Sequence, residues 1–343
     1  MRFHLASDIT KHCTERLLAV GARELYTLDA RTNFLCQSRY RREDRQLAGM
    51  LRQARALAFR LGVFGFPLIY LGWAYLFWLP IFASGESVWS FPKIILFLAG
   101  GASPLIAGVV LAGLTGGRQR LREMGQRLID IRRINLRWLA VILLFWLVFD
   151  LLMAGAALVL GITDRPLGIA WDAVSTPRTL AFMLLLSFVF PAVEEVGLRG
   201  YWLDELQERF SPVVAGLING AAWAVWHAPF VWFPGYYANT SFNPQLWWWL
   251  PSIVLHTLLI VWVYNGTNRS ILAVLLFHGM MNFTGEFLGL APEIFPFMLI
   301  GNLLAAATVV AGSRVMRRGC ASASKPGVNP TTLCEVDSGS DRA

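Results

Sequence analysis

The stretch that decides the fold is TLAFMLLLSFVFPAVEEVGLRG, residues 179–200, because it carries charge into an otherwise apolar run. Its first fifteen residues have no charged side chain, and Glu194 and Glu195 then follow, with Arg199 shortly after. A helix of about 20 mostly apolar residues is long enough to span a bilayer. Ionisable side chains at membrane depth cost ~2.5–3.5 kcal/mol each to insert and are therefore retained for function. The stretch predicts a transmembrane helix that contains functional ionisable residues.

Similar apolar runs recur along the whole chain. Of its 343 residues, 56% are hydrophobic and only 15% are charged, and the mean hydropathy is +0.51. This composition differs from that of soluble domains and predicts an all-α polytopic membrane protein with about eight transmembrane helices. The predicted spans are 61–83, 93–115, 138–160, 178–197, 211–231, 247–264, 270–287 and 294–313.

The distribution of basic residues predicts the orientation. Of 30 Lys and Arg residues, 27 fall before residue 61, in a predicted loop at 116–137, or in the other segments on the same side of the spans. The opposite side holds only Lys93, Arg165 and Arg178. Cytoplasmic loops are enriched in Lys and Arg. We therefore expect an integral, multi-pass protein of the plasma (inner) membrane with both termini cytoplasmic. The net charge of +8 is explained by these loops, so no nucleic-acid partner is expected.

The polar residues within the spans follow a regular spacing. Glu195 and Arg199 are four residues apart, so they share one helix face and can form an ion pair. Glu194 is rotated from Glu195 by about 100° and is available for another task. The same spacing recurs in two later spans, in the pairs Trp223–His227 and His278–Asn282.

Two further ionisable residues lie in apolar helices. His256 has no polar companion at helical spacing, which favours a packing contact between helices. Asp150, in the third span, is interpreted mainly as an acid that bonds a neighbouring helix, with a smaller chance of reaching the site. The other histidines, His4 and His12, precede the first span.

The three motifs occur in a recognisable order. EEVGLRG (194–200), WAVWH (223–227) and HGMMN (278–282) resemble the motifs of the CAAX prenyl endopeptidase and bacteriocin-processing (CPBP) family of intramembrane proteases. Each motif alone is weak, but three in order within apolar helices are a specific signal. The resemblance covers about residues 178–285.

The resemblance implies peptide-bond hydrolysis in an intramembrane catalytic cavity that opens to the cytoplasmic side. Glu194 and His227 would activate a water molecule, and His278 and Asn282 would stabilise the oxyanion. Glu195, Arg199 and Trp223 would support them. The implied substrate is a membrane-anchored or prenylated-like peptide at the lipid bilayer.

The motifs depart from the family pattern at two positions. Trp223 stands where the family usually has Phe, and Leu198 stands where an aromatic residue is frequent before the arginine. We expect neither side chain to touch a polar group, so neither departure should affect catalysis.

The residues leave the role of a metal open. Glu194, His227 and His278 could instead ligate Zn²⁺ with a water in the open position. The chain lacks the HExxH signature of many zinc proteases. The metal-free glutamate mechanism is favoured, with zinc as the alternative, and the residues point to no other cofactor.

Two other functions are alternatives. A non-catalytic bacteriocin-immunity or scaffold protein of the same fold would not need the complete set of four polar residues. A transporter would use acids and histidines to relay protons, but the two halves of the chain show no matching Gly/Pro-interrupted segments. The GxGD and GxSx signatures of other intramembrane proteases are also missing.

The chain divides into five predicted parts. The sequence DRQLAGMLRQARALAFR, residues 44–60, predicts an amphipathic helix before the first span. The parts are a basic cytoplasmic N-terminal segment (1–60), three transmembrane helices (61–160), a CAAX-protease-like catalytic core (178–287), the last transmembrane helix (288–318) and a disordered cytoplasmic tail (319–343).

Overall fold

The computed structural model describes residues 61–238 and 242–317, and within these ranges it is helical, with no β-strand. Seven helices in the described part are long and apolar enough to cross a membrane, and an eighth span results if the bent pair α4–α5 counts as one. The protein is thus an all-α, multi-pass membrane protein. The predictions for residues 1–60 and 319–343 fall outside the described residues.

The helices follow one another with short connections. They are η1 (Leu61–Gly65), α3 (Phe66–Ser84), α4 (Lys93–Gly101), α5 (Ser103–Ile129), η2 (Ile131–Arg133), α6 (Leu136–Val159), α7 (Trp171–Val174), α8 (Pro177–Gly197), η3 (Leu198–Trp202), α9 (Leu203–Gln207), α10 (Pro212–His227), η4 (Ala228–Trp232), α11 (Leu246–Gly266), α12 (Ile271–Leu288), α13 (Ile294–Gly312) and α14 (Arg314–Arg317).

Local sequence explains where the helices begin. The side chains of Asn135, Ser211 and Ser270 accept hydrogen bonds from backbone N–H groups in the first turns of α6, α10 and α12. Thr176 and Thr179 form a capping box at the start of α8. These caps satisfy N–H groups that have no partner within a helix.

Two predicted boundaries were wrong. The second predicted span is two helices, α4 and α5, which meet at an angle of 44°. The predicted loop at 116–137 is helical as far as Ile129, with a kink at Gly117, where φ is +61°. The extension is amphipathic and buries Met124, but its arginines hide it from a search for apolar runs.

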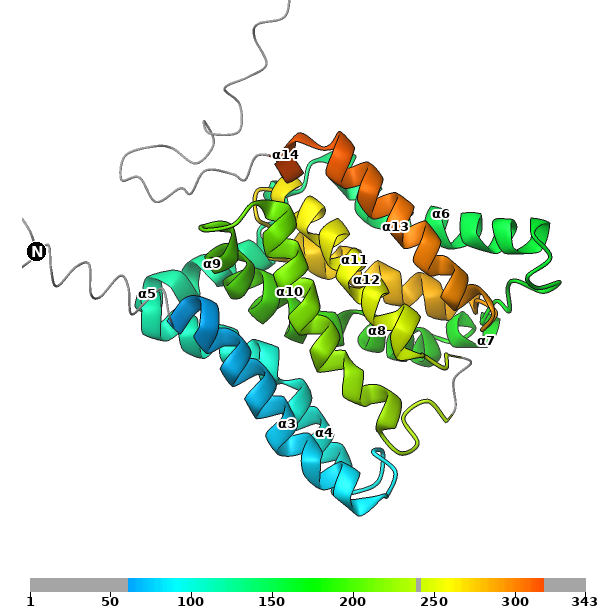
Figure 1. Ribbon diagram of the computed structural model, residues 1–343, viewed down its shortest axis with the longest axis horizontal. Helices are drawn as coiled ribbons and strands as arrows, with labels where there is room; N and C mark the ends of the chain where they lie inside the picture. The colour runs from blue at the N-terminus through cyan, green and yellow to red at the C-terminus, as the bar shows by residue number, and fades with distance from the viewer. Residues whose placement is uncertain (1–60, 239–241, 318–343) are drawn as a thin grey trace, which may run out of the picture. The chain divides into compact units, whose positions relative to one another are not determined.

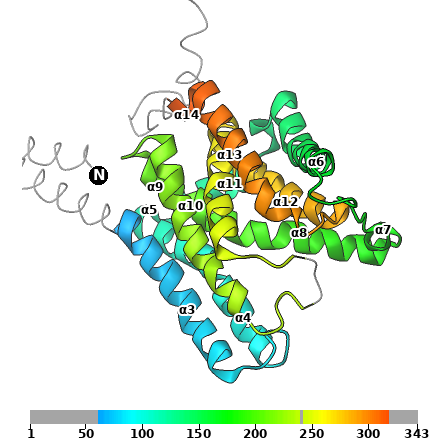
Figure 2. The same ribbon diagram turned by 45° about the vertical axis from the view of Figure 1, so that its right-hand side comes forward.

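The helices pack in an order that places the motifs together. α8 lies between α5 and α12, and α12 in turn packs against α6. α11 lies between α10 and α13 near the middle of the bundle, while α3 and α4 lie side by side at one edge (Figures 1 and 2). The three motif helices, α8, α10 and α12, therefore surround a common interior.

A close contact between two glycines holds the first motif against a neighbouring helix. α5 and α8 approach closely at Gly108 and Gly197, where a methyl group on Gly108 would lie 2.6 Å from Gly197 Cα. A methyl group on Gly197 would overlap the carbonyl oxygen of Pro104. Because Gly197 is less than one turn from Glu194, this crossing holds the glutamate-bearing turn against α5.

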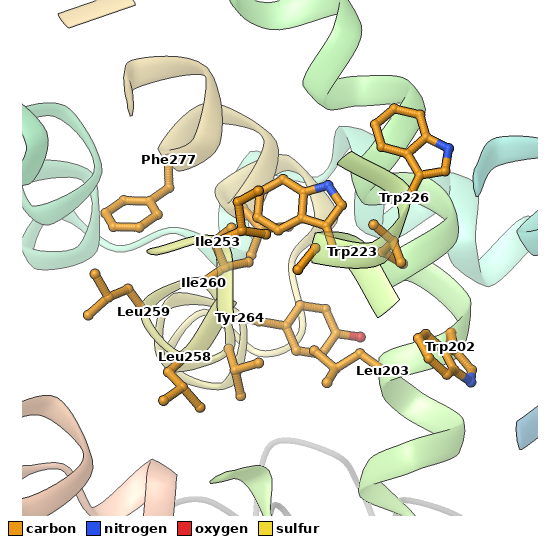
Figure 3. Close-up of a cluster of buried hydrophobic side chains, with 14 of the residues drawn as sticks. Trp202, Leu203, Trp223, Trp226, Ile253, Leu258, Leu259, Ile260, Tyr264 and Phe277 are labelled. Atoms are coloured by element: carbon orange, nitrogen blue, oxygen red, sulfur yellow. The ribbon is translucent and has the colours of Figure 1, made fainter. Parts of the chain in front are cut away.

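The bundle is apolar both inside and outside. Figure 3 shows part of the buried core, in which Trp202, Trp223, Tyr264 and Phe277 come from four different helical segments. Large apolar residues are also exposed on the outer surface, among them Leu68, Leu152, Phe182 and Leu304. Such a surface suits contact with lipid tails.

Candidate active site

The two adjacent glutamates face different surroundings. Glu194 lines an internal cavity, whereas Glu195 is fully buried and does not line it. The helix then continues through a π-helical turn, Leu198–Trp202, of the kind that is frequent at functional sites. The Asn219 side chain donates a 3.0 Å hydrogen bond to the Leu198 carbonyl and so supports this turn.

The cavity has a volume of about 840 Å³. All three motifs contribute to its wall, and none of the described residues that line it is Lys or Arg. Its polar side chains include Asp150, Glu194, His227, Ser252, His256, His278, Asn282, Glu286 and Asn302. The candidate residues Glu194, His227, His278 and Asn282 are thus brought to one cavity.

Trp223 orients Glu194 directly. Its indole Nε1 donates a 2.6 Å hydrogen bond to Glu194 Oε2, and the contact is buried. The expectation that Trp223 touches no polar group was therefore wrong, because an indole carries an N–H donor that the usual Phe lacks. Leu198, the other departure, is fully buried.

Glu195 connects the first and third motifs. Its Oε1 accepts hydrogen bonds from Arg199 Nη1 and from His278 Nδ1, both at 2.8 Å. The ion pair expected from the spacing is therefore formed. Arg199 also donates to Thr257 Oγ1 at 3.2 Å, and its guanidinium lies 4.5 Å from the centre of the Trp223 ring.

His227 has a defined tautomer. Its Nδ1 lies 2.9 Å from the backbone carbonyl oxygen of Trp223. A carbonyl only accepts, so Nδ1 carries the proton and Nε2 of the neutral ring holds a free lone pair. The ring is held by edge-on contacts with Trp223, Trp226 and Trp249.

Asn282 lies on the cavity wall, one helical turn after His278. No other described residue forms a hydrogen bond with its side chain. The amide can therefore donate to a molecule that enters the cavity.

The described residues form no compact metal-ligand cluster. Among residues 61–238 and 242–317, no three His, Cys, Asp or Glu side chains are grouped so that they could hold a metal ion. Glu194, His227 and His278 share the cavity, and Nε2 is the ring nitrogen of His278 that is left for a ligand, since its Nδ1 is engaged by Glu195.

His256 and Asp150 also reach the cavity. His256 makes the expected packing contact, with its ring 5.1 Å from that of Trp146, but it lines the cavity as well. Asp150 bonds a neighbouring helix as expected, through Thr284 Oγ1 at 2.7 Å, and it too lines the cavity.

Several residues at the site escaped the sequence analysis. Thr257 and Asn302 gave no signal, because a single polar residue in an apolar helix is common. Asn219 did give a signal, because Asn219, Trp223 and His227 are spaced four residues apart and therefore share one helix face. This signal was overlooked.

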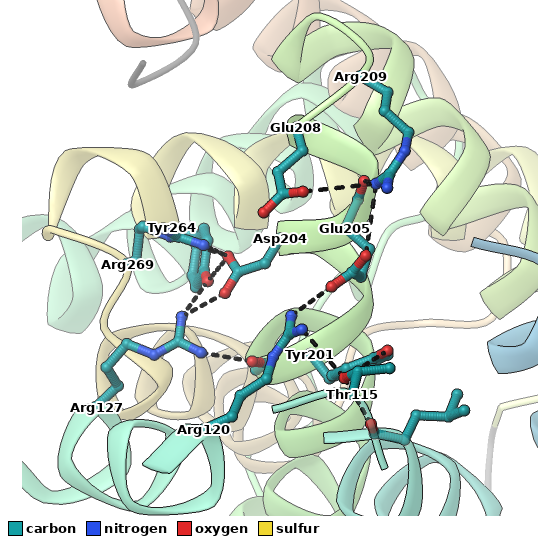
Figure 4. Close-up of polar contacts among 12 residues, drawn as sticks. Thr115, Arg120, Arg127, Tyr201, Asp204, Glu205, Glu208, Arg209, Tyr264 and Arg269 are labelled. Atoms are coloured by element: carbon teal, nitrogen blue, oxygen red, sulfur yellow. Dashed lines mark hydrogen bonds and ion pairs between the residues drawn. The ribbon is translucent and has the colours of Figure 1, made fainter. Parts of the chain in front are cut away.

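An ion-pair network lies just beyond the π-helical turn (Figure 4). Asp204 accepts from Arg127 Nη1 at 2.9 Å, from Arg269 and from the Tyr264 hydroxyl at 2.5 Å. The Asp204 carboxylate raises the pKa of Arg269 above its ordinary value. Arg127 also donates to the Gly200 carbonyl, so the network is tied to the first motif. Glu205 pairs beside it with Arg120 at 2.6 Å.

Comparison with known proteins places these motifs in a described family. A family model for "Type II CAAX prenyl endopeptidase Rce1-like" proteins matches residues 176–284, which contain all three motifs. The chain is also 26% identical over 227 residues to the CAAX prenyl protease 2 of Methanococcus maripaludis. That alignment covers 64% of this chain and 82% of the relative.

Proposed function

Because the chain belongs to the CAAX prenyl endopeptidase and bacteriocin-processing (CPBP) family of membrane-embedded proteases, we propose that it hydrolyses a peptide bond of a membrane-anchored polypeptide inside the cavity. The observation that carries this proposal is the convergence of Glu194, His227, His278 and Asn282 on one cavity wall.

Glu194 and His227 activate the water. The hydrogen bond from Trp223 orients the Glu194 carboxylate, and the His227 Nε2 lone pair accepts a hydrogen bond from the same water. Glu194 takes the proton as the water attacks the carbonyl carbon of the scissile bond, and later passes it to the leaving amine.

His278 and Asn282 stabilise the oxyanion. The Asn282 amide donates directly. The His278 Nδ1 proton is committed to Glu195, so the ring donates through Nε2 only as an imidazolium. The Glu195 carboxylate orients the ring through this hydrogen bond, which gives the second glutamate a positioning role. Each such donor contributes about 10²–10³ in turnover.

The proposed mechanism is of the glutamate type, with zinc dependence as the alternative. The side chains of this chain supply a base and two oxyanion donors, which are the groups that hydrolysis requires.

The substrate is proposed to be a membrane-anchored peptide, with lipidated peptides included. The aromatic and aliphatic cavity wall suits such a segment. We further propose that the protein lies in the plasma membrane with both termini cytoplasmic, which is supported by the arginines gathered at one end of the bundle.

A cleavage screen tests the proposal. Purified full-length protein is incubated with a library of peptides fused to a membrane anchor, and the products are identified by mass spectrometry. We expect cleavage by the wild type and none by Glu194→Gln, which keeps the hydrogen bond from Trp223. A folded wild type that cleaves nothing would instead support the non-catalytic immunity or scaffold function.

A further inference from the structure

The two ends of the bundle differ in charge and in packing. One end, here called the arginine end, holds Arg120, Arg127, Arg209 and Arg269, which pair with Asp204 or Glu205. Arg133 joins the same end by donating to the Asn268 carbonyl at 2.8 Å.

The opposite end is a rim of four connecting loops. The α3–α4 loop bonds to the segment after η4, through Val88 N–H and the Pro234 carbonyl at 2.9 Å. The α6–α7 loop bonds to the α12–α13 loop, through Gly168 N–H and the Gly289 carbonyl, also at 2.9 Å. We call this end the loop rim.

The cavity belongs to the loop rim. Trp89, Gly168, Ala170, Tyr236 and Gly289, which come from all four loops, line it. No residue of the described loops and helix ends at the arginine end lines the cavity.

The arginine end is closed below the cavity. Glu195, Arg199, Leu198, Tyr201 and Leu203 are all fully buried there. The apolar cluster of Figure 3 includes Leu203, and the ion pairs of Asp204 and Glu205 in Figure 4 follow directly in the chain. A substrate therefore cannot reach Glu194 from the arginine end without unfolding this layer.

The charge bias places the arginine end in the cytoplasm. We propose that the cavity is reached from the opposite, non-cytoplasmic side, and that the substrate is the translocated segment of a membrane-anchored polypeptide. This proposal departs from the cytoplasmic opening that the family resemblance implies. The substrate part of this inference rests on the proposed function, whereas the accessibility part does not.

Cysteine labelling tests the accessibility. Cys13, Cys36, Cys320 and Cys334 are replaced by serine in the full chain. Ala170→Cys or Trp89→Cys then probes the loop rim, and Gln119→Cys, an exposed position at the arginine end, is the matched control. In intact cells, a membrane-impermeant maleimide should label the rim cysteines, and it should label Gln119→Cys only after permeabilisation. The reverse pattern would overturn the inference.

Paired reporters test the substrate side. Two single-span substrates carry one cleavable sequence, placed outside in the first and inside in the second. We expect wild-type cells to cleave only the outside reporter. Cleavage of only the inside reporter would refute the inference and keep the proposed function, whereas cleavage of neither, by cells that display the labelled protein, would refute the proposed function.

A second inference comes from partly satisfied polar groups in the cavity. Trp146 and Asp150 on α6, His256 on α11 and Asn302 on α13 line one part of it, here called the polar wall. α6 and α13 meet closely there, because a methyl group on the neighbouring Gly301 would lie 3.1 Å from the Phe149 ring.

The polar wall is only partly satisfied by the protein. His256 and Asn302 interact with each other, whereas Trp146 Nε1 is buried without a hydrogen bond to any described residue. Asp150 has the Thr284 hydroxyl but forms no ion pair with any described residue. Buried polar atoms are normally satisfied, so these atoms are suited to a ligand.

The charges select the ligand. Asp150, Glu194 and Glu286 line the cavity without any described Lys or Arg, so an anionic group would be repelled. An apolar group would leave the wall unsatisfied. We infer that Asp150, together with the side-chain oxygen of Asn302, binds a cationic Lys or Arg side chain of the substrate, with Asp150 as the specificity-determining residue.

Matched peptides test this subsite, which rests on the proposed function. Cleavage of anchored peptides with Lys or Met at each position near the scissile bond is compared by kcat/KM. The wild type should prefer Lys at one position by about tenfold, and both Asp150→Asn and the uncharged change Asn302→Leu should reduce the preference. An unchanged preference in the folded variants would refute the inference, whereas no cleavage of any peptide by the wild type would refute the proposed function.

Discussion

Glu195 Oε1 lies 2.8 Å from His278 Nδ1, so the first and third motifs meet through one buried oxygen atom. The same atom accepts a hydrogen bond from Arg199 Nη1, also at 2.8 Å. Glu195 thereby fixes the orientation of the His278 ring and the position of its Nδ1 proton. The fully buried member of the glutamate pair thus acts through His278, while Glu194 faces the cavity.

The Glu195→Gln variant should lower kcat by about 10–100-fold with little change in KM, because a neutral amide holds the His278 ring and Arg199 less firmly than a carboxylate does. Steady-state kinetics would measure this. Thermal unfolding provides the control. If kcat falls only in proportion to the fraction of folded protein, the positioning role is contradicted.

The Trp223→Phe variant should reduce turnover by about 10-fold or more, because a hydrogen bond to a charged group contributes ~1.5–3 kcal/mol. The ring would still cover Arg199. Trp202→Phe is a matched control, since it removes a buried indole hydrogen bond of 3.0 Å to the Val63 carbonyl at a residue that does not line the cavity. Equal turnover in the two variants would show that Trp223 does not orient Glu194.

The Gly197→Ala variant should destabilise the fold by about 1–3 kcal/mol, because the new methyl group overlaps the Pro104 carbonyl and separates α5 from α8. Gly72→Ala is the control, since nothing lies within 4 Å of the added methyl group at that helical position. Thermal unfolding in detergent should show a lower Tm for the first variant only. An unchanged Tm for Gly197→Ala would mean that the crossing is looser than described.

The Asp204→Ala variant should cost about 1.5–3 kcal/mol, because the partly buried Arg127 and Arg269 lose hydrogen bonds to a charged acceptor. Glu86→Ala breaks an ion pair with Lys93 in which the Glu86 side chain is 59% exposed, so it should cost at most about 1 kcal/mol. Denaturation of both variants in parallel would measure the difference. Similar small losses would exclude a structural role for the network.

The sequence predicts the membrane-spanning segments well, because a long apolar run can be recognised from the sequence alone. All eight predicted spans correspond to helical segments, and the motif spacing correctly places Glu195 beside Arg199. The extension of α5 to Ile129 was missed because an arginine-rich amphipathic helix outside the membrane gives no apolar run.

Partners between helices could not be predicted in the same way. Spacing within one helix defines its polar face but not the helix that this face meets. The contacts of Trp223 with Glu194 and of His278 with Glu195 depend on how α8, α10 and α12 are rotated. The gathering of Trp146, His256 and Asn302 depends on the close approach of α6, α11 and α13 in the same way.

The most direct test of the central claim is the cleavage rate of metal-free protein. Wild type and Glu194→Gln are treated with chelator, their residual metal is quantified, and both are assayed on the same anchored peptide with and without added zinc. The glutamate mechanism predicts that the wild type keeps its full rate without metal and that Glu194→Gln loses at least about 10²-fold. A wild-type rate that disappears with the metal and returns with zinc, or a Glu194→Gln variant that cleaves normally, would contradict it.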